Sequence, residues 1–239
     1  MSLKKITVIL PCYNEEESIP VVLPELLQFR EDAIKNRDFA DIQVIVVDDG
    51  SSDSSSKLLS QFSDVEIISF SENKGYGAAL KKGLEVAVGD WVGFYDLDCT
   101  CHPMDLLKVK DFLNQDTPAM LCGIRMGQDT GMPRVRQLGN RIFRWVVSLF
   151  LGRSVADACS GYRFFHRDYA QVYLQYLPDK LNFTLAMTVF TLRNKMNYKE
   201  FNIQYSERAG QSKLSTFKEG VRFFFTILNY RFSPGLKRL

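Results

Sequence analysis

Residues 42–53 read IQVIVVDDGSSD, a run of apolar, mostly β-branched residues that ends abruptly in two aspartates. A run of this kind, without polar alternation, is typical of a strand that is buried on both faces. Lys5–Leu10 (KITVIL) and Trp91–Tyr95 (WVGFY) repeat the pattern, and Val65–Phe70 is expected to form another strand. The first hundred residues therefore predict a sheet with a buried centre.

Helical segments separate these strands. Apolar residues recur at helical spacing after Glu15, Ser51 to Ser56 offer N-caps for a short helix, and residues 74–77 open a helix that continues through Ala87. This alternation indicates βαβ units and a parallel sheet. The second half predicts a strand at Met120–Ile124 and helices over 134–151, 181–196 and 215–231. We predict an α/β fold in one domain, residues 1–239.

The composition is that of an ordinary folded protein, with 46% hydrophobic and 24% charged residues among 239. A net charge of +2 gives no reason to expect nucleic acid as a partner. The first ten residues lack the features of a signal peptide, and no uncharged apolar run reaches the roughly 20 residues that span a bilayer. The five scattered cysteines suit reduced thiols. These features favour a soluble or peripheral protein of the cytoplasm.

Acidic residues follow two of the predicted strands, as Asp48-Asp49 and as Asp96-Leu97-Asp98. Ligands bind beyond the carboxyl ends of parallel strands, so both clusters should face one crevice. Paired carboxylates repel each other unless a cation neutralises them, and Mg²⁺ or Mn²⁺ prefers such oxygen ligands together with phosphate. The pattern suits the diphosphate leaving group of a nucleotide. By itself, Asp96-Leu97-Asp98 is equally compatible with a solvated acidic turn, and Asp48–Asp53 taken alone better fits a turn with an N-cap.

Four motifs occur in a fixed order: Pro11–Glu16 (PCYNEE), Val46–Asp53 (VVDDGSSD), Asn73–Ala78 (NKGYGA) and Asp96–Asp98 (DLD). They resemble the motifs of the family-2 glycosyltransferases, which have the nucleotide-sugar-binding GT-A fold. The resemblance implies a Rossmann-like, mostly parallel sheet flanked by helices. It also implies that Pro11, Tyr13, Glu15 and Asp48 hold the base and ribose of the nucleotide, and that Asp96 and Asp98 bind metal and diphosphate.

The second half resembles the dolichyl-phosphate mannosyltransferase branch, which includes bacterial polyprenyl-phosphate glycosyltransferases. The matching residues are Gly123–Arg125, Arg134, Arg136, Asn140, Asp157–Arg163 (DACSGYR) and Arg208–Leu214 (RAGQSKL). The resemblance implies that Arg125, Arg136, Ser212 and Lys213 contact phosphate groups of the donor or acceptor. Arg134 and Arg208 belong to the same basic set, because guanidinium forks suit phosphate oxygens. Taken singly, each arginine also fits a solvated surface charge.

Residues 181–199 contain no Asp or Glu, although many family-2 enzymes carry a carboxylate base on a helix in this half. A hydroxyl acceptor needs such a base, whereas a phosphate with a second pKa of about 6 is already an anion at neutral pH. The missing base favours a lipid phosphate as nucleophile. A base supplied by Asp157 or His166 would undo this inference. Cys99-Thr100 follows the D-x-D motif where close relatives often have Gln or Gly, which leaves the third metal ligand open.

These observations predict an inverting transfer of a hexose from a UDP- or GDP-sugar to an undecaprenyl or dolichyl phosphate. Asp98, Arg125 and Arg136 are the predicted catalytic residues. One alternative is a related glycosyltransferase that acts on a sugar or glycolipid hydroxyl. Another is an inactive nucleotide-sugar-binding subunit that regulates a membrane partner.

Residues 215–239 predict a helix in the membrane interface followed by a basic tail. Its apolar residues Phe217, Val221, Phe223, Phe224, Phe225, Ile227, Leu228 and Tyr230 fill one broad arc of a helical wheel, and Arg231, Lys237 and Arg238 follow. Such a helix suits an anionic membrane surface. Residues 145–151 (WVVSLFL) offer a second apolar surface. Packing on the core, on a membrane-protein partner or on a second copy of the chain are the alternatives. The predicted location is the cytoplasmic face of a membrane.

Overall fold

In the part of the chain that the structure describes, the strands form one sheet in the order β3-β2-β1-β4-β6-β5-β7. The computed structural model describes residues 3–113, 120–125, 134–206, 208 and 216–232, and of residues 134–137 and 216–219 the backbone alone. The strands are β1 (Lys5–Cys12), β2 (Asp41–Asp48), β3 (Glu66–Ser69), β4 (Trp91–Phe94), β5 (Met120–Ile124), β6 (Arg163–His166) and β7 (Tyr198–Asn202).

One strand runs against the others. β1 pairs in parallel with β2 and with β4, β2 pairs in parallel with β3, and β5 pairs in parallel with β7. β6 is antiparallel to both of its neighbours, β4 and β5. The predicted mostly parallel α/β sheet is therefore confirmed. β6 and β7 were not predicted, and β6 joins the two parallel parts of the sheet.

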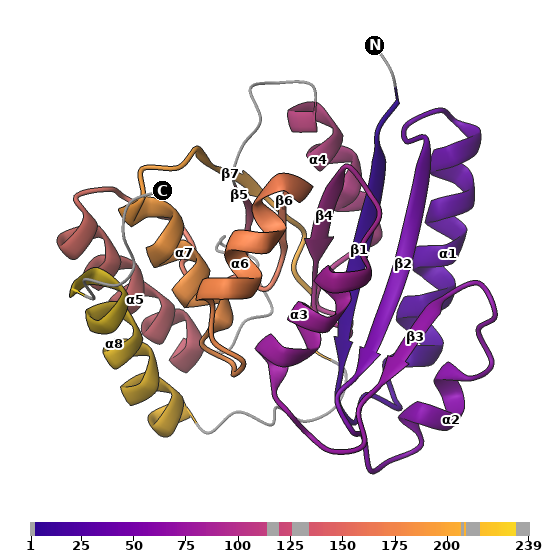
Figure 1. The fold of residues 1–239 in the computed structure, drawn as a ribbon, viewed down its shortest axis with the longest axis horizontal. Coiled ribbons are helices and arrows are strands. Elements are labelled where there is room, and N and C mark those ends of the chain that lie inside the picture. The colour runs from indigo at the N-terminus through magenta and orange to yellow at the C-terminus, as the bar shows by residue number, and fades with distance from the viewer. Residues whose placement is uncertain (1–2, 114–119, 126–133, 207, 209–215, 233–239) are drawn as a thin grey trace.

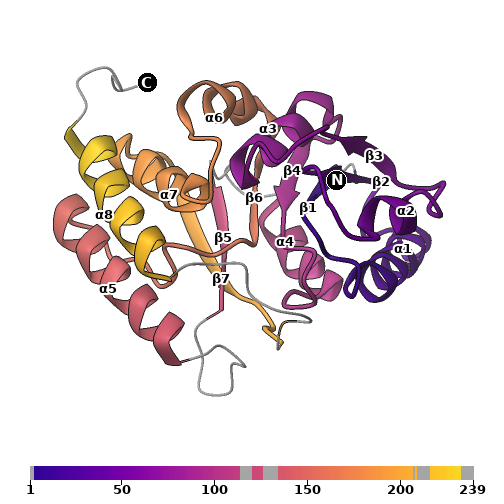
Figure 2. The ribbon, with the colours of Figure 1, turned by 90° about the horizontal axis from the view of Figure 1, so that it is seen from below.

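Helices cover both faces of the sheet (Figures 1 and 2). On one face lie α1 (Ile19–Lys35), α2 (Ser55–Leu59) and α4 (Leu106–Leu113), whose apolar residues share a core cluster with the sheet. On the other face lie α3 (Tyr76–Val86), α6 (Ala170–Tyr176) and α7 (Phe183–Arg193). α5 (Arg134–Leu151) and α8 (Thr216–Phe232) lie side by side outside α7.

α7 is a central helix. Every residue from Phe183 to Leu192 is buried, which is expected of a helix that is apolar on all sides. Its neighbours α5 and α8 consequently form an outer layer with one side against α7 and the other side exposed. Among the helices of the described residues, none combines the length and the apolarity needed to cross a bilayer.

The turns at the carboxyl ends of the strands form the crevice. Gly50 follows β2 with a φ of +70°, a conformation that glycine adopts without strain. A Cβ atom at this position would lie 2.5 Å from the backbone of Glu72, so the turn also needs a residue without a side chain. The segment after β2 is thereby held against the segment that leads into α3.

Candidate active site

A cavity of about 220 Å³ opens beyond the carboxyl ends of β1 and β4, beside the first turn of α3. Six residues predicted to bind ligands line it: Pro11, Tyr13, Glu15, Asp96, Asp98 and Arg208. Asp49, Asn73, Gly75, Tyr76 and Leu181 also line it, and they were not predicted as ligands. The structure thus brings together the first motif, the D-x-D motif and Arg208, which is distant from both in sequence.

The two D-x-D carboxylates are held by neighbouring donors. Asp96 is half-buried, and its Oδ1 accepts a hydrogen bond of 2.7 Å from the Tyr76 hydroxyl. Asp98 is buried, and its Oδ1 accepts from the backbone N–H (3.1 Å) and the hydroxyl of Thr100. The sequence alone did not indicate the contributions of Tyr76 and Thr100. Both carboxylates are therefore oriented before any ligand arrives.

The electrostatics of the pair favour a cation. The pKa of Asp96 is raised to about 6, because burial and then the negative charge of nearby Asp98 raise it, while the hydrogen bond from Tyr76 opposes the increase. A carboxylate with a raised pKa gains free energy when a positive charge approaches its ionised form.

A divalent metal fits this donor set in part. Asp96 and Asp98 supply hard oxygen ligands at the edge of a cavity, and Mg²⁺ or Mn²⁺ commonly takes one or two carboxylates and completes its shell with phosphate oxygens and water. In the described residues no group of three His, Cys, Asp or Glu side chains is arranged to hold a metal. The two carboxylates thus suit a metal that arrives together with a diphosphate.

Arg208 bridges two carboxylates of the cavity. Its Nη1 lies 3.1 Å from Oδ2 of Asp98, and its Nη2 contacts Oε1 of Glu15. All three side chains are largely buried, with exposed fractions of 21% for Arg208, 8% for Asp98 and 13% for Glu15. A predicted phosphate ligand is thus found beside the predicted metal ligands.

The first two motifs bind each other. The backbone N–H of Asn14 donates to the Ser51 hydroxyl (2.9 Å), and Asn14 Oδ1 accepts from the N–H of Ser52 (2.7 Å). The N–H of Glu15 donates to the Ser55 hydroxyl (2.8 Å). Asn14 has a φ of 53°, in the left-handed region that asparagine tolerates better than most residues. Much of the motif sequence therefore serves to join two loops.

Asp48 and Asp49 have different surroundings. Asp48 is buried at the end of β2, and its Oδ1 accepts from the N–H of Ser51 (3.0 Å); it is not among the residues that line the cavity. Asp49 does line the cavity, and its two oxygens accept from the N–H groups of Lys74 (2.7 Å) and Gly75 (2.9 Å). Asp49 thus fixes the backbone of the two residues that precede α3. The assignment of Asp48 to the nucleotide stays a prediction.

Arg125 is paired with Asp157. The Nε and Nη2 of Arg125 lie 2.8 Å and 3.1 Å from the two carboxylate oxygens, and Asn140 donates to the same carboxylate at 2.8 Å. Burial alone would raise the pKa of Asp157, but Arg125 and Asn140 hold it below its ordinary value. Arg125 does not line the cavity, so its predicted contact with phosphate stays a prediction.

Neither alternative base is placed to act at the cavity. Asp157 is fully buried and bonded to Arg125, and its lowered pKa makes it a weak proton acceptor. His166 pairs with Trp91 at the start of β4, whereas the cavity lies beyond the opposite end of that strand. Its ring packs edge-on against the Trp91 indole, with centroids 5.6 Å apart. Neither residue therefore supplies the base that would undo the preference for a phosphate acceptor, and that preference stays a prediction.

Four predicted phosphate ligands fall where side chains are not described. Arg134 and Arg136 lie in the first turn of α5, of which the structure gives the backbone alone. Ser212 and Lys213 lie outside the described residues.

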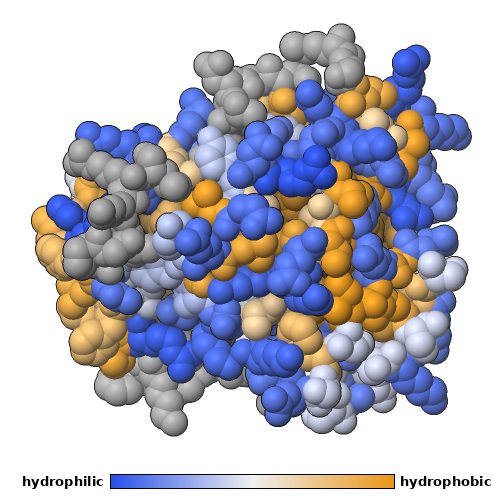
Figure 3. Space-filling view, in the orientation of Figure 1, coloured by the Kyte–Doolittle hydropathy of each residue, from blue (hydrophilic) through white to orange (hydrophobic). Residues whose placement is uncertain are grey.

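The exposed sides of α5 and α8 form an apolar surface. On α5, Leu138, Ile142, Trp145 and Leu149 recur at helical spacing and are 51–64% exposed. On α8, Val221, Phe224, Phe225 and Phe232 are 43–62% exposed. In Figure 3 apolar side chains gather at the left edge, where these helices lie. The predicted single arc of α8 is wrong in one respect, because Ile227 and Tyr230 are buried against α7 and contribute no exposed surface.

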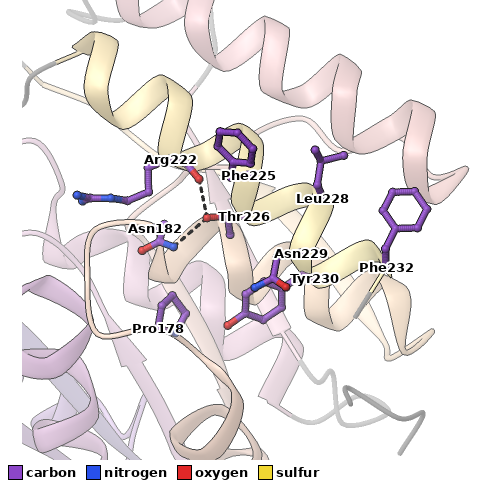
Figure 4. A pocket seen from close by; sticks show the side chains of 9 residues that line it. All are labelled: Pro178, Asn182, Arg222, Phe225, Thr226, Leu228, Asn229, Tyr230 and Phe232. Atoms are coloured by element: carbon purple, nitrogen blue, oxygen red, sulfur yellow. Dashed lines mark hydrogen bonds between the residues drawn. The ribbon is translucent and has the colours of Figure 1, made fainter. Parts of the chain in front are cut away.

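A groove of about 960 Å³ runs along α8 (Figure 4). Phe225, Leu228 and Phe232 line it from the helix, and Pro178 and Asn182 line it from the loop before α7. The Asn182 amide donates to the Thr226 hydroxyl at 2.8 Å, which joins the loop to the helix. Leu181 of the same loop lines the cavity. One loop therefore forms a wall of both the cavity and the groove.

Two glycines make close contacts beside the cavity that the sequence could not distinguish from ordinary turns. Gly161 has a close contact with Asp96, since a Cβ atom there would lie 2.5 Å from Asp96 Oδ2. In the sequence Gly161 resembled an ordinary turn glycine. Gly77 likewise lies against the backbone oxygen of Pro178, which a Cβ atom would approach to 2.2 Å. Only the tertiary structure distinguishes such glycines from glycines in open turns.

Comparisons with known proteins show which enzymes the chain is similar to. The dolichyl-phosphate beta-glucosyltransferase of Dictyostelium discoideum is 24% identical, over 95% of this chain and 74% of its own. The human dolichyl-phosphate beta-glucosyltransferase is 27% identical, over 90% and 71%. The undecaprenyl-phosphate 4-deoxy-4-formamido-L-arabinose transferase of Proteus mirabilis is 28% identical, over 90% and 64%.

A solved structure has the same fold. Glucosyl-3-phosphoglycerate synthase from Mycobacterium tuberculosis, in complex with Mn²⁺, UDP and glucosyl-3-phosphoglycerate, superposes with a TM-score of 0.71 at 21% identity, over 95% of this chain and 80% of that one. Residues 7–174, well over half of the sequence, match the family described as Glycosyl transferase family 2. With the motifs and the fold in agreement with that match, the chain belongs to glycosyl transferase family 2.

Proposed function

We propose that this protein is an inverting glycosyltransferase that moves a hexose from a UDP- or GDP-sugar to a polyprenyl phosphate. The relatives named above as dolichyl-phosphate and undecaprenyl-phosphate transferases support the lipid phosphate as acceptor. Nucleotide-sugar use is supported by the family and by the ordered motifs around the cavity.

The observation that carries the proposal is the state of the carboxylates in the cavity. Glu15 is bonded to Arg208, and Asp49 is bonded to two backbone N–H groups. Asp96 accepts from Tyr76, and Asp98 is engaged by its neighbours on both oxygens. Among the described residues, each carboxylate that lines the cavity therefore has a structural partner, which disfavours a free general base. A phosphate acceptor needs none, because it is an anion at neutral pH.

The donor is proposed to lie across the ends of β1, β2 and β4. Pro11, Tyr13, Glu15 and Asp48 would hold the base and ribose, and Asp96 would lie next to the diphosphate. Asp96 and Asp98 would hold Mg²⁺ or Mn²⁺, which when bound supplies positive charge against the departing nucleoside diphosphate.

The acceptor is proposed to attack from the opposite side of the sugar. A phosphate oxygen forms a bond to the anomeric carbon as the bond from that carbon to the diphosphate oxygen breaks, and the electron pair leaves with the diphosphate. Arg125, Arg134, Arg136, Arg208, Ser212 and Lys213 are the proposed phosphate ligands. The isoprenoid chain would follow the apolar groove of α8, because the wall of that groove also borders the cavity.

The apolar surface of α5 and α8 is proposed to lie on the membrane that contains the acceptor. Its exposed aromatic and aliphatic side chains are accompanied by the exposed arginines Arg141, Arg144 and Arg153. This combination suits the interface of an anionic bilayer, here its cytoplasmic face. A membrane-protein partner or a second copy of the chain would cover the same surface.

A donor screen tests the proposal. Release of nucleoside diphosphate is followed with each UDP- and GDP-hexose, with Mn²⁺ or Mg²⁺, and with or without undecaprenyl or dolichyl phosphate. Release that depends on the lipid phosphate and is lost in Asp98→Ala is the expected result. Release with a saccharide and without lipid phosphate would instead support a hydroxyl acceptor. Nucleotide binding without any release would support the inactive subunit.

A further inference from the structure

Arg208 is fixed beside the D-x-D motif by pairing between two distant segments. Cys101 and Tyr205 form an antiparallel bridge, and the N–H of Ser206 donates to the carbonyl oxygen of Thr100 at 3.0 Å. The His102 ring then contacts the Ser206 hydroxyl through Nε2 at 2.7 Å. Tyr205 and Ser206 thus lie alongside the residues that follow Asp98. This pairing brings a guanidinium to the carboxylates from 110 positions further along the chain.

The guanidinium occupies the place of a cation. It lies between Asp98 and Glu15, and it uses the one oxygen of Asp98 that Thr100 does not engage. In the described part of the chain its Nε is buried without a hydrogen-bond partner. A metal that binds Oδ2 of Asp98 would therefore compete with Arg208 for that oxygen.

We propose that Arg208 is a resident counter-ion of the D-x-D motif, which is displaced from Asp98 when the donor arrives with its metal. This inference rests on the proposed function and adds an order of events to it. Before the donor binds, Arg208 balances the charge of Asp98 and Glu15 and keeps their geometry. After displacement its guanidinium is available to an anion, and the acceptor phosphate is the anion that binds next. Loading of the donor would thereby prepare the site for the acceptor.

Metal affinity in the absence of nucleotide tests the inference. Binding of Mn²⁺ alone is measured by titration with paramagnetic resonance detection in the intact wild-type protein and in Arg208→Gln. Removal of the competing guanidinium is expected to tighten Mn²⁺ binding about tenfold, the scale of one charge-assisted hydrogen bond. Arg208→Lys, which keeps the charge but loses the fork, is expected to lie between the two.

Lys180→Gln is the matched control for charge. Lys180 donates to the backbone oxygen of Lys74 near the cavity, and its positive charge acts on Asp49 without bonding to Asp98. Loss of this charge is expected to change Mn²⁺ affinity by less than about twofold. Equal affinities in Arg208→Gln and Lys180→Gln would overturn the inference. The rise in melting temperature on addition of Mn²⁺ gives a second readout, expected to be larger in Arg208→Gln than in the wild type.

Asp98→Asn separates this inference from the proposed function. Loss of Mn²⁺ binding in Asp98→Asn, with tighter binding in Arg208→Gln, is the expected result. Loss in Asp98→Asn without tightening in Arg208→Gln would overturn the counter-ion role alone. Unchanged Mn²⁺ binding in Asp98→Asn would overturn both the metal site and the inference.

Discussion

Gly161→Ala should weaken the metal site without harming the fold. Gly161 lies in the loop before β6, and its φ is outside the left-handed region, so alanine is compatible with its backbone. The new Cβ atom would lie 2.5 Å from Asp96 Oδ2, and 3.4 Å is the start of ordinary contact. The carboxylate would therefore have to move by about 0.9 Å, away from the position in which Tyr76 holds it.

That displacement is large for a metal ligand. Ligand distances in metal sites are held to within about 0.2 Å, so a shift several times larger removes Asp96 from the coordination shell. Disturbing such supporting contacts typically costs about 10- to 100-fold in metal affinity, and we expect a loss of this size. The free energy of unfolding should change little. Alanine lowers the entropy of the unfolded chain by the equivalent of about 0.4–1 kcal/mol, which offsets part of the strain that the new Cβ contact causes.

The assay is calorimetric titration of Mn²⁺ in the presence of UDP, and separately of GDP, with the melting temperature as a check of the fold. Gly220→Ala in α8 is the control, because a Cβ atom at Gly220 meets no atom within 4 Å. Gly220→Ala should bind Mn²⁺ like the wild type. Wild-type Mn²⁺ affinity in folded Gly161→Ala would refute the expected loss of the Asp96 ligand.

Three further predictions address charge and the apolar surface. Because the pKa of Asp96 is raised to about 6 from an ordinary value of 3.8, ionisation of this side chain destabilises the metal-free fold fully above about pH 6, and the penalty shrinks as the pH falls from 6 towards 3.8. In EDTA, Asp96→Asn should melt higher than the wild type at about pH 7.5, and the difference should be roughly halved at about pH 5; a constant difference would contradict this. Asp157→Asn leaves the guanidinium of Arg125 buried without its counter-charge, and urea unfolding should show a loss of about 3 kcal/mol; a loss below about 1 kcal/mol would mean that the ion pair is dispensable. Trp145→Glu with Phe225→Glu should abolish co-sedimentation with anionic vesicles and leave the melting temperature within about 3 °C of the wild type, whereas unchanged sedimentation would point to a protein partner for this surface.

The first half of the fold could be predicted because its signals are local. β1, β2 and β4 are buried, and such strands have continuous apolar sequences. The bounds of α5 agree with the predicted helix over residues 134–151, since its apolar period is strong. β6 and β7 have only four and five residues, and their pairing partners are distant in sequence. Segments this short form strands because of their neighbours, which sequence periodicity does not report.

The residues of the site that belong to local motifs could also be predicted, whereas the contacts between distant segments could not. The motifs placed Glu15, Asp96 and Asp98 together, and the cavity contains all three. The contact between Arg208 and Glu15 joins residues 193 positions apart, and the sequence around each residue gives no indication that the two meet. The role of Asp49 at the entry to α3 was hidden because adjacent aspartates look equivalent in sequence, although only one of them borders the cavity.

The position of Arg208 limits how far the reacting atoms can be from the bilayer. Eight peptide steps separate Arg208 from Thr216, the first residue of α8, and a fully extended chain of that length spans at most about 28 Å. A protein anchored through α8 therefore holds Arg208, whose guanidinium contacts Asp98, within this reach of the start of the anchored helix. If α8 lies on the membrane as proposed, sugar transfer would take place in a thin layer of water above the headgroups, where a lipid phosphate is concentrated and a freely diffusing saccharide is not.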